Sequence, residues 1–279
     1  RIIKKYQPIN SILDPFQGSG TVIVESQLHN IQQIFGNDLN PLSILLTKTK
    51  TESHKIIDID LKTNELRKKI AASFKQYLHV FKKLDEYILS NDIDVSDKNK
   101  WGNDASAILK TFFLENNIQF NIPEFNKVGL WFKPVVIIKL QLLKNIINDE
   151  SDELFKNFLN VAFSECIRLV SNRRNNVFKL YRMPTSEIIQ FNPDLFNIFL
   201  KILNINILLL NDFKLGVADK TSVIKIYNED SRLLSSIQDD SIDLMITSPP
   251  YGDSQTTVAY GQFSQLTLDW LGFEDSNML

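Results

Sequence analysis

The sequence predicts an α/β protein in which a parallel sheet is interrupted by a long helical insertion. Near the N-terminus, two apolar runs are each followed by a turn and a helical pattern, which gives two β-α units in tandem. From about residue 55 to 215 the pattern is helical, and strand patterns return after residue 216. Tandem β-α units favour a doubly wound, Rossmann-like sheet that binds ligands at the carboxyl ends of its strands.

The first unit begins with a strand over residues 11–16 (SILDPF), followed by a glycine turn and a helix over residues 21–28. The second unit has a strand over residues 31–35 (IQQIF) and the turn GNDLNP, followed by a helix from Pro41 to about Lys50. Proline suits the first turn of a helix, where its missing N–H costs no hydrogen bond.

The middle of the chain is predicted to be a helical domain. Apolar residues recur at helical spacing in residues 66–89, 105–114, 135–147, 154–170 and 195–210. Residues 91–103 are expected to form a polar loop, and residues 121–134 a connection punctuated by Pro and Gly. Strands are then expected over residues 222–227 and 242–247, with a short helix near residues 232–237. Residues 1–54 and 216–279 would thus form the sheet domain, and residues 55–215 the insertion.

The composition excludes several classes of protein. The chain has 279 residues, a formal charge of -2 and 43% hydrophobic residues, which is ordinary for a globular protein and excludes dominant disorder. One cysteine, Cys166, and three scattered histidines indicate neither disulfides nor a metal site. No apolar run reaches the roughly 18–20 residues of a membrane span, and no signal-peptide core is present, so a cytoplasmic protein is predicted. Because the chain opens without methionine and stops soon after a core motif, we expect a fragment of a longer protein.

Three of the predicted strands end in glycine or polar residues. The first is followed by DPFQGSGT (residues 14–21), whose glycines allow a tight turn and close approach to a ligand. The second ends at Asp38, a carboxylate placed to accept hydrogen bonds from ribose hydroxyls. The third is followed by NEDS (residues 228–231). Taken singly, the glycine motif is more typical of a plain turn and NEDS of a capping loop, while Asp38 is equally typical of an acid near a helix N-cap.

The last strand is followed by TSPPYG (residues 247–252), which is more specific. Two prolines remove two backbone donors and fix φ at both positions, so the preceding carbonyls point in one direction. A rigid turn alone requires neither the serine before the prolines nor the tyrosine after them. This motif therefore favours a function over a purely structural turn.

Together, the motifs DPFQGSGT, GNDLNP, NED and TSPPY, each at a strand end, resemble those of the amino-methyltransferase family of DNA methyltransferases. That family transfers a methyl group from S-adenosylmethionine to N4 of cytosine or N6 of adenine. The resemblance implies a Rossmann-like methyltransferase sheet. That sheet would be incomplete in this chain, because the strands expected downstream are absent. The insertion would be a DNA-recognition region.

The resemblance also implies roles for individual residues. Phe16, Gly18 and Gly20 match residues that line the methionine and ribose parts of the cofactor, and Asp38 matches the acid that binds the ribose. The full set of expected cofactor-binding residues is Asp14, Phe16, Gly18, Gly20, Thr21, Asp38 and Asp230, the last lying near the adenine. The catalytic turn falls on Ser248, Pro249, Pro250 and Tyr251.

The chemistry follows from the nature of the acceptor, an amine whose lone pair is delocalised into the base. The base must leave the duplex, and Tyr251 would stack on it. The Ser248 hydroxyl and the Pro249 carbonyl would accept the amine hydrogens and stabilise the charge that develops on nitrogen. Cytosine-C5 methylation, which needs a thiolate, is disfavoured because Cys166 lies in an apolar helical context typical of a buried cysteine.

A basic segment is the candidate for contacts with DNA phosphates. Arg168 and Arg182 bracket a stretch without acidic residues, and the expected DNA-binding residues in it are Arg173, Arg174, Lys179 and Arg182. A solvated basic face is an equally good interpretation. Trp131 and Phe132 are expected in the core rather than as stacking platforms.

The leading hypothesis is a site-specific methyltransferase of double-stranded DNA from a restriction–modification system, with a cognate restriction endonuclease as a partner. Serine before the prolines favours cytosine N4 over adenine N6. One alternative is an RNA guanine-N2 methyltransferase, although Asp is usual there at position 248. The other is a non-catalytic module that binds cofactor or DNA, against which the intact SPPY motif argues.

Overall fold

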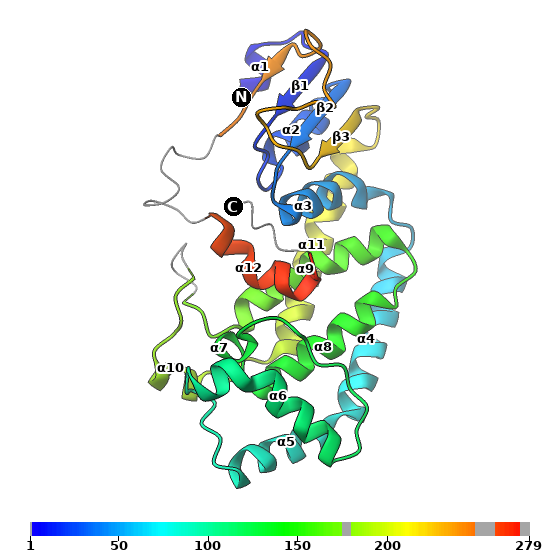
Figure 1. The fold of residues 1–279 in the computed structure, drawn as a ribbon. Coiled ribbons are helices and arrows are strands. Elements are labelled where there is room, and N and C mark those ends of the chain that lie inside the picture. The colour runs from blue at the N-terminus through cyan, green and yellow to red at the C-terminus, as the bar shows by residue number, and fades with distance from the viewer. Residues whose placement is uncertain (1, 175–179, 249–259, 274–279) are drawn as a thin grey trace. The chain divides into compact units, whose positions relative to one another are not determined.

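The computed structural model describes residues 2–174, 180–248 and 260–273. Its four described strands form one sheet: β1 (Ser11–Asp14), β2 (Gln33–Asn37), β3 (Val223–Tyr227) and β4 (Leu244–Met245). The strands are ordered β3-β2-β1-β4, and every adjacent pair is parallel (Figure 1). The predicted α/β class with a parallel, Rossmann-like sheet is therefore confirmed.

The register brings the strand ends together. Asp14 at the end of β1 pairs with Gly36, and the next residue of β2, Asn37, pairs with Tyr227 at the end of β3. β4 joins the other side of β1, and beyond it the Ile246 amide still donates to the Leu13 carbonyl at 3.0 Å. The residues that follow all four strands thus emerge at one edge of the sheet.

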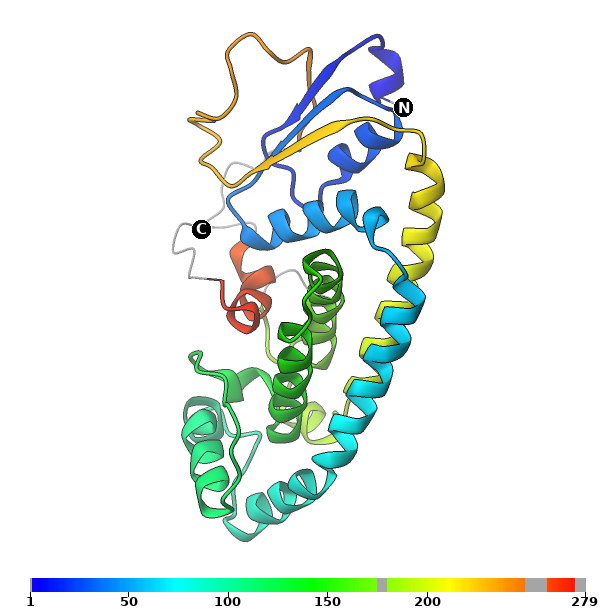
Figure 2. The ribbon, with the colours of Figure 1, turned by 90° about the vertical axis from the view of Figure 1, so that its right-hand side faces the viewer.

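The sheet is anchored by apolar residues on one of its faces. A buried cluster is formed by Ile12, Ile23, Ile31 and Ile34. Ile224 and other partly buried aliphatic residues pack against it. The cluster joins the strands to α2 (Thr21–Leu28) and includes Ile3 of α1 (Ile2–Lys5). α2 also contacts α3 (Pro41–Glu52), which begins at a proline, as predicted (Figure 2).

The chain divides into two compact units. The sheet unit comprises Arg1–Ile57 and Asn204–Leu279, and the helical unit comprises Asp58–Leu203. The division falls inside α11 (Leu195–Val217), so the predicted boundary at residue 215 lies within a helix rather than at its end. The last described helix, α12 (Tyr260–Leu271), belongs to the sheet unit.

The helical unit has a core rich in aromatic residues. Trp101, Phe112, Phe132 and Phe163 are fully buried, and the Trp101 indole donates to the Phe132 carbonyl at 3.1 Å. Phe132 is thus a core residue, as expected, and Trp131 is half-buried. The helices of this unit are α4 (Ile59–Gln76), α5 (Leu78–Ser90), α6 (Lys100–Glu115), α7 (Val128–Trp131), α8 (Pro134–Asn148), α9 (Glu153–Val170), α10 (Thr185–Gln190) and the first part of α11.

Three predicted elements are corrected by the structure. Residues 66–89 form two helices, because Tyr77 at φ -89° and ψ 3° leaves the helical conformation. The expected polar loop of residues 91–103 ends early, since α6 begins at Lys100. Residues 232–237 form turns rather than a helix, with Leu234 at φ 42° and the Ser236 hydroxyl and amide held by the Glu229 carboxylate.

α11 adds a candidate that the search for apolar runs in the sequence did not include. The prediction considered uninterrupted apolar runs, whereas α11 continues through its polar residues for 23 residues. Among the described helices it alone is long and apolar enough to cross a bilayer, and 22% of its most apolar 18-residue window is buried. Length and composition are weak evidence for a span, because core helices of soluble proteins pass the same test.

Candidate active site

The glycine turn after β1 has a backbone conformation that favours glycine. Gly18 has φ +50° and Gly20 has φ +77°, both in the left-handed region. A Cβ built on Gly20 would lie 2.4 Å from the Thr47 hydroxyl, whereas one on Gly18 would meet nothing within 4 Å. The backbone at Gly18 therefore faces open space, where a ligand can approach it closely.

Asp38 is brought directly against this turn. Its carboxylate accepts a hydrogen bond from the Gly18 amide at 2.8 Å and another from the Asn40 amide at 2.9 Å. Each carboxylate oxygen has a second lone pair for a further donor. The two motifs that were predicted to bind a nucleoside cofactor thus meet in space, with the carboxylate fixed by backbone donors.

Asn37, beside Asp38, is a site residue that the sequence motifs did not reveal. It is fully buried, and its side-chain amide donates to the Glu229 carbonyl at 2.9 Å and to the Ser231 hydroxyl at 3.0 Å. Its side-chain oxygen accepts from the Glu229 amide at 2.9 Å. The Ser231 hydroxyl in turn donates to the Pro15 carbonyl at 2.6 Å. Asn37 therefore connects the loops that follow three strands, β1, β2 and β3.

Asp14 is the most buried carboxyl group at this edge. Its side chain is 3% exposed and accepts from the Phe16 amide at 3.1 Å. Burial raises the pKa of Asp14 above its usual value, and the nearby charge of Asp38 acts in the same direction. Hydrogen bonds from Thr247 and Phe16 oppose this shift.

The remaining predicted cofactor residues lie around the same edge. Phe16 is 39% exposed, and Thr21 is exposed at the start of α2. Asp230 is ion-paired with Arg232 at 2.5 Å, and this partner lowers the pKa of Asp230 to about 2. The Asp230 carboxylate is thus ionised at neutral pH, but its partner must be displaced or shared if it is to contact an adenine.

Only the first residue of the predicted catalytic turn can be placed. Ser248 is exposed and follows β4 by three residues, while its neighbour Thr247 lies beside Asp14. The β4 side of the sheet therefore brings Ser248 to the edge that carries the glycine turn. Pro249, Pro250 and Tyr251 lie outside the described residues.

α12, which follows the predicted catalytic turn in sequence, is tied to the same edge. The Asn40 side-chain amide donates to the hydroxyl of Ser264 at 3.0 Å, and Ser264 is 3% exposed. The Asn40 oxygen caps α3 through the Leu42 amide at 3.0 Å. Asn40 therefore joins the edge that carries Asp38 to the helix that follows the SPPY motif in sequence.

The basic residues predicted to contact DNA lie in the helical unit in different environments. Arg173 is 2% exposed, and Arg182 donates to the Leu130 carbonyl at 2.9 Å and the Ser96 carbonyl at 3.0 Å. Arg174 is exposed, and Lys179 lies outside the described residues. Arg173 and Arg182 thus have structural surroundings, which leaves Arg174 as the described member of the set that is free to reach a phosphate.

Cys166 has the surroundings expected of a structural cysteine. It is fully buried in α9, and burial raises the pKa of its thiol well above the usual range. A thiol in this state is not a nucleophile near neutral pH. No group of three or more potential metal ligands occurs among the described residues.

The donor set suits S-adenosylmethionine. The open glycine turn leaves room for the backbone to approach the ligand, and the carboxylates of Asp38 and Asp14 match ribose hydroxyls and a cationic group. These features lie at the carboxyl ends of parallel strands, where ligands bind in open α/β sheets.

Comparison with known proteins gives two similar sequences. The chain is 37% identical over 268 residues to the type II methyltransferase M.MvaI of Kocuria varians, covering 94% of this chain and 51% of that protein. It is 25% identical over 185 residues to the type II methyltransferase M.MjaII of Methanocaldococcus jannaschii, covering 57% of this chain and 34% of that protein. The chain thus spans about half of the length of the first relative and about a third of the second.

No family model matches the chain, and no solved structure matches it. The similarity to M.MvaI, however, extends over nearly the whole chain and includes both the sheet unit and the helical unit. It confirms the relationship that the four strand-end motifs predict, which is to the DNA methyltransferase family.

Proposed function

We propose that this protein is a site-specific DNA methyltransferase of a restriction–modification system. It would move a methyl group from S-adenosylmethionine to the exocyclic amine of a flipped base, with cytosine N4 favoured and adenine N6 as the other acceptor. The observation that carries the proposal is the meeting of Asp38, Gly18 and the strand that leads to Ser248 at one sheet edge. The similarity to type II methyltransferases supports it independently.

In this proposal the cofactor edge binds and orients the donor. Asp38 holds the ribose hydroxyls while its own position is fixed by the Gly18 and Asn40 amides. Asp14 attracts the cationic end of the cofactor, and Phe16 offers an exposed aromatic face. S-adenosylmethionine supplies an electrophilic methyl group on a sulfonium, and the residues of this edge hold it in a fixed place.

Ser248 and the turn that follows it would act on the base. The Ser248 hydroxyl oxygen and the Pro249 carbonyl accept the hydrogens of the target amine, which favours a pyramidal nitrogen with its lone pair directed at the donor. Positive charge grows on that nitrogen as the nitrogen–carbon bond forms and the carbon–sulfur bond of the donor breaks, so fixed acceptors would stabilise the transition state more than the ground state. The sulfonium would leave as a neutral thioether, and the methylated amine would lose one proton to solvent. Tyr251 stacks on the base, an interaction worth about 1–3 kcal/mol.

The partners and location follow from the same proposal. The substrate is double-stranded DNA, and a cognate restriction endonuclease of the same sequence specificity is the functional partner. The protein acts in the cytoplasm, where it meets chromosomal DNA.

The test uses the natural full-length protein, S-adenosylmethionine and duplex DNA of mixed sequence, followed by digestion to nucleosides and mass spectrometry. The proposal predicts N4-methylcytosine or N6-methyladenine, and a large loss of product in Ser248→Ala with cofactor affinity unchanged. Asp38→Ala should instead weaken cofactor binding. Methylation of RNA alone, or of no nucleic acid by a protein that still binds the cofactor, would refute the DNA substrate.

A further inference from the structure

The helices α4 and α5 carry a long stretch of positive charge that contains no acidic residue. Residues 66–84 contain five lysines and one arginine but neither Asp nor Glu. Acidic residues return only at the ends of this stretch, at Glu65, Asp85 and Glu86. We name the exposed lysines of this stretch the α4–α5 lysine face: Lys68, Lys69, Lys75, Lys82 and Lys83.

The amphipathic character of the two helices directs these lysines outward. Leu66 and Ile70 of α4 are buried, as are Val80, Phe81 and Leu84 of α5. All five lysines of the α4–α5 lysine face are exposed. The apolar residues thus anchor the helices in the unit, and the charged face is left to solvent.

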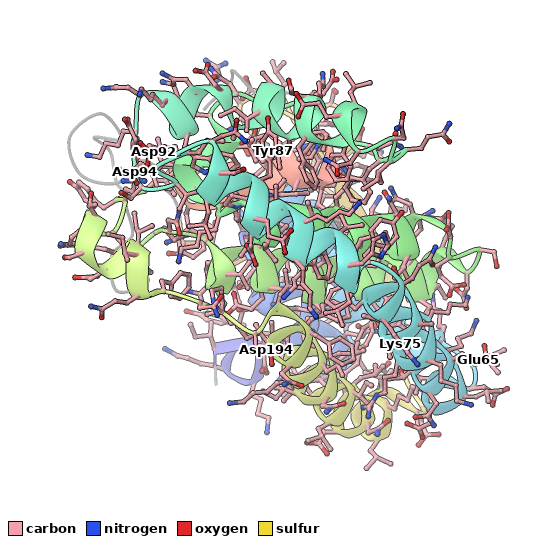
Figure 3. All side chains as sticks on the ribbon, turned by 90° about the horizontal axis from the view of Figure 1, so that it is seen from below. Glu65, Lys75, Tyr87, Asp92, Asp94 and Asp194 are labelled. Atoms are coloured by element: carbon pink, nitrogen blue, oxygen red, sulfur yellow. The ribbon has the colours of Figure 1, made fainter. Side chains whose placement is uncertain are left out.

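The lysines of this face are also available for a partner. None of them forms an ion pair with an acid among the residues that the structure describes. Lys62, six residues before Lys68 on α4, differs because it is paired with Asp152 at 3.2 Å. Figure 3 looks onto the α5 end of the helical unit and shows Lys75 where α4 gives way to α5.

The spacing of these lysines suits a regular polyanion. Lys68 and Lys75 are seven residues apart on α4, so they share a face and are separated by about 10 Å along the helix axis. Three base-pair steps of B-DNA also span about 10 Å. Lys82 and Lys83 continue the positive charge on α5, beyond the break at Tyr77.

We propose that the α4–α5 lysine face binds the phosphate backbone of the DNA duplex. The inference rests on the proposed function and names a surface for it that differs from the basic segment of residues 168–182. Two arginines of that segment are engaged in the structure, since Arg173 is buried and Arg182 binds two backbone carbonyls. With a formal net charge of -2, the protein needs a local concentration of free cations to hold DNA.

The test compares two triple variants of the full-length protein. The first variant combines Lys68→Gln, Lys75→Gln and Lys82→Gln. The matched control combines Lys98→Gln, Lys100→Gln and Lys127→Gln. The control residues are also exposed lysines of the helical unit, and the net change in charge is the same. Binding of a labelled duplex is measured by fluorescence anisotropy at a series of salt concentrations.

Each phosphate contact contributes about 0.9 to the slope of log affinity against log salt, so the first variant should lose about 2 to 3 in slope. The control should keep the wild-type slope, and both variants should keep wild-type affinity for S-adenosylmethionine. Equal slopes in the wild type and the first variant would overturn the inference while leaving the proposed function intact. Absence of DNA binding by the wild type would instead overturn both.

Discussion

Asn37 and Glu229 exchange two hydrogen bonds, each 2.9 Å long, between the side-chain amide of the first and the backbone of the second. The last register pair between β2 and β3 is Asn37 with Tyr227, and the Asn37 side chain reaches two residues further, to Glu229. Because Asn37 precedes Asp38, the same residue that fixes the β3 loop also helps to fix the predicted ribose-binding carboxylate.

Replacement of Asn37 by Ala should therefore damage both stability and cofactor binding. The substitution leaves the half-buried amide and carbonyl of Glu229 without their side-chain partner, a loss of about 1–3 kcal/mol in the free energy of unfolding. Urea unfolding and calorimetric titration with S-adenosylmethionine measure the two effects. Asn228→Ala is a suitable control, because Asn228 is exposed and makes one bond, to the Asp38 carbonyl. Equal effects of the two substitutions would contradict the central role of Asn37.

Asp38→Asn should weaken cofactor affinity at least tenfold while the protein stays folded. An amide presents one acceptor oxygen in place of two, so it cannot accept from both Gly18 and Asn40 and still serve a ribose. Calorimetric titration measures the affinity, and circular dichroism checks the fold. Affinity within twofold of the wild type would remove Asp38 from the cofactor site.

The raised pKa of Asp14 predicts a specific dependence of stability on pH. A carboxyl whose folded-state pKa lies above its unfolded value binds its proton more tightly in the native state. Its contribution to stability is fully present below the ordinary value of 3.8 and is lost as the pH rises through the raised pKa. Asp14→Asn should remove this loss, because the amide does not ionise. As the pH rises from 3.8 through the raised pKa, the unfolding free energy of the variant should therefore increase relative to that of the wild type. Urea unfolding at a series of pH values measures it, and a constant difference would argue against the assignment.

Arg182 should prove to be a stabilising residue rather than a DNA contact. Its guanidinium joins the Leu130 and Ser96 carbonyls, which belong to separate segments of the helical unit. Arg182→Gln should lower the free energy of unfolding by about 1.5–3 kcal/mol, the range for a hydrogen bond from a charged donor. Arg174→Gln, at an exposed position, should change it by less than about 0.5 kcal/mol. Denaturant unfolding of both variants tests this, and the reverse order would support the DNA-contact interpretation of Arg182.

The sequence was sufficient to predict the fold class because local patterns carry that information. Short apolar runs predicted the strands, and Gly18 and Gly20 predicted the first turn, where the structure has positive φ angles. The approach of Asp38 to Gly18 could be expected because parallel strands end at one edge.

Other features depend on tertiary packing and have no local signature. The burial of Arg173 is decided by segments far from it in sequence, so a charge count could not separate it from the exposed Arg174. Asn37 was overlooked because its three-loop network involves Glu229 and Ser231, about 190 positions away. The expected helix at residues 232–237 is replaced by turns, because the Glu229 carboxylate binds Ser236.

The short chain of contacts from Asp38 through Asn40 to Ser264 has a thermodynamic consequence. Asn40 touches the Asp38 carboxylate with its backbone amide and the helix beyond the SPPY motif with its side chain. A cofactor bound to Asp38 and a base bound next to Ser248 would then be linked through the hydrogen bonds of Asn40. If the cofactor raises the affinity for the base by some factor, the base must raise the affinity for the cofactor by the same factor. The order in which the two ligands bind would thus affect only the rates, and at equilibrium the affinity for each ligand would depend on the presence of the other.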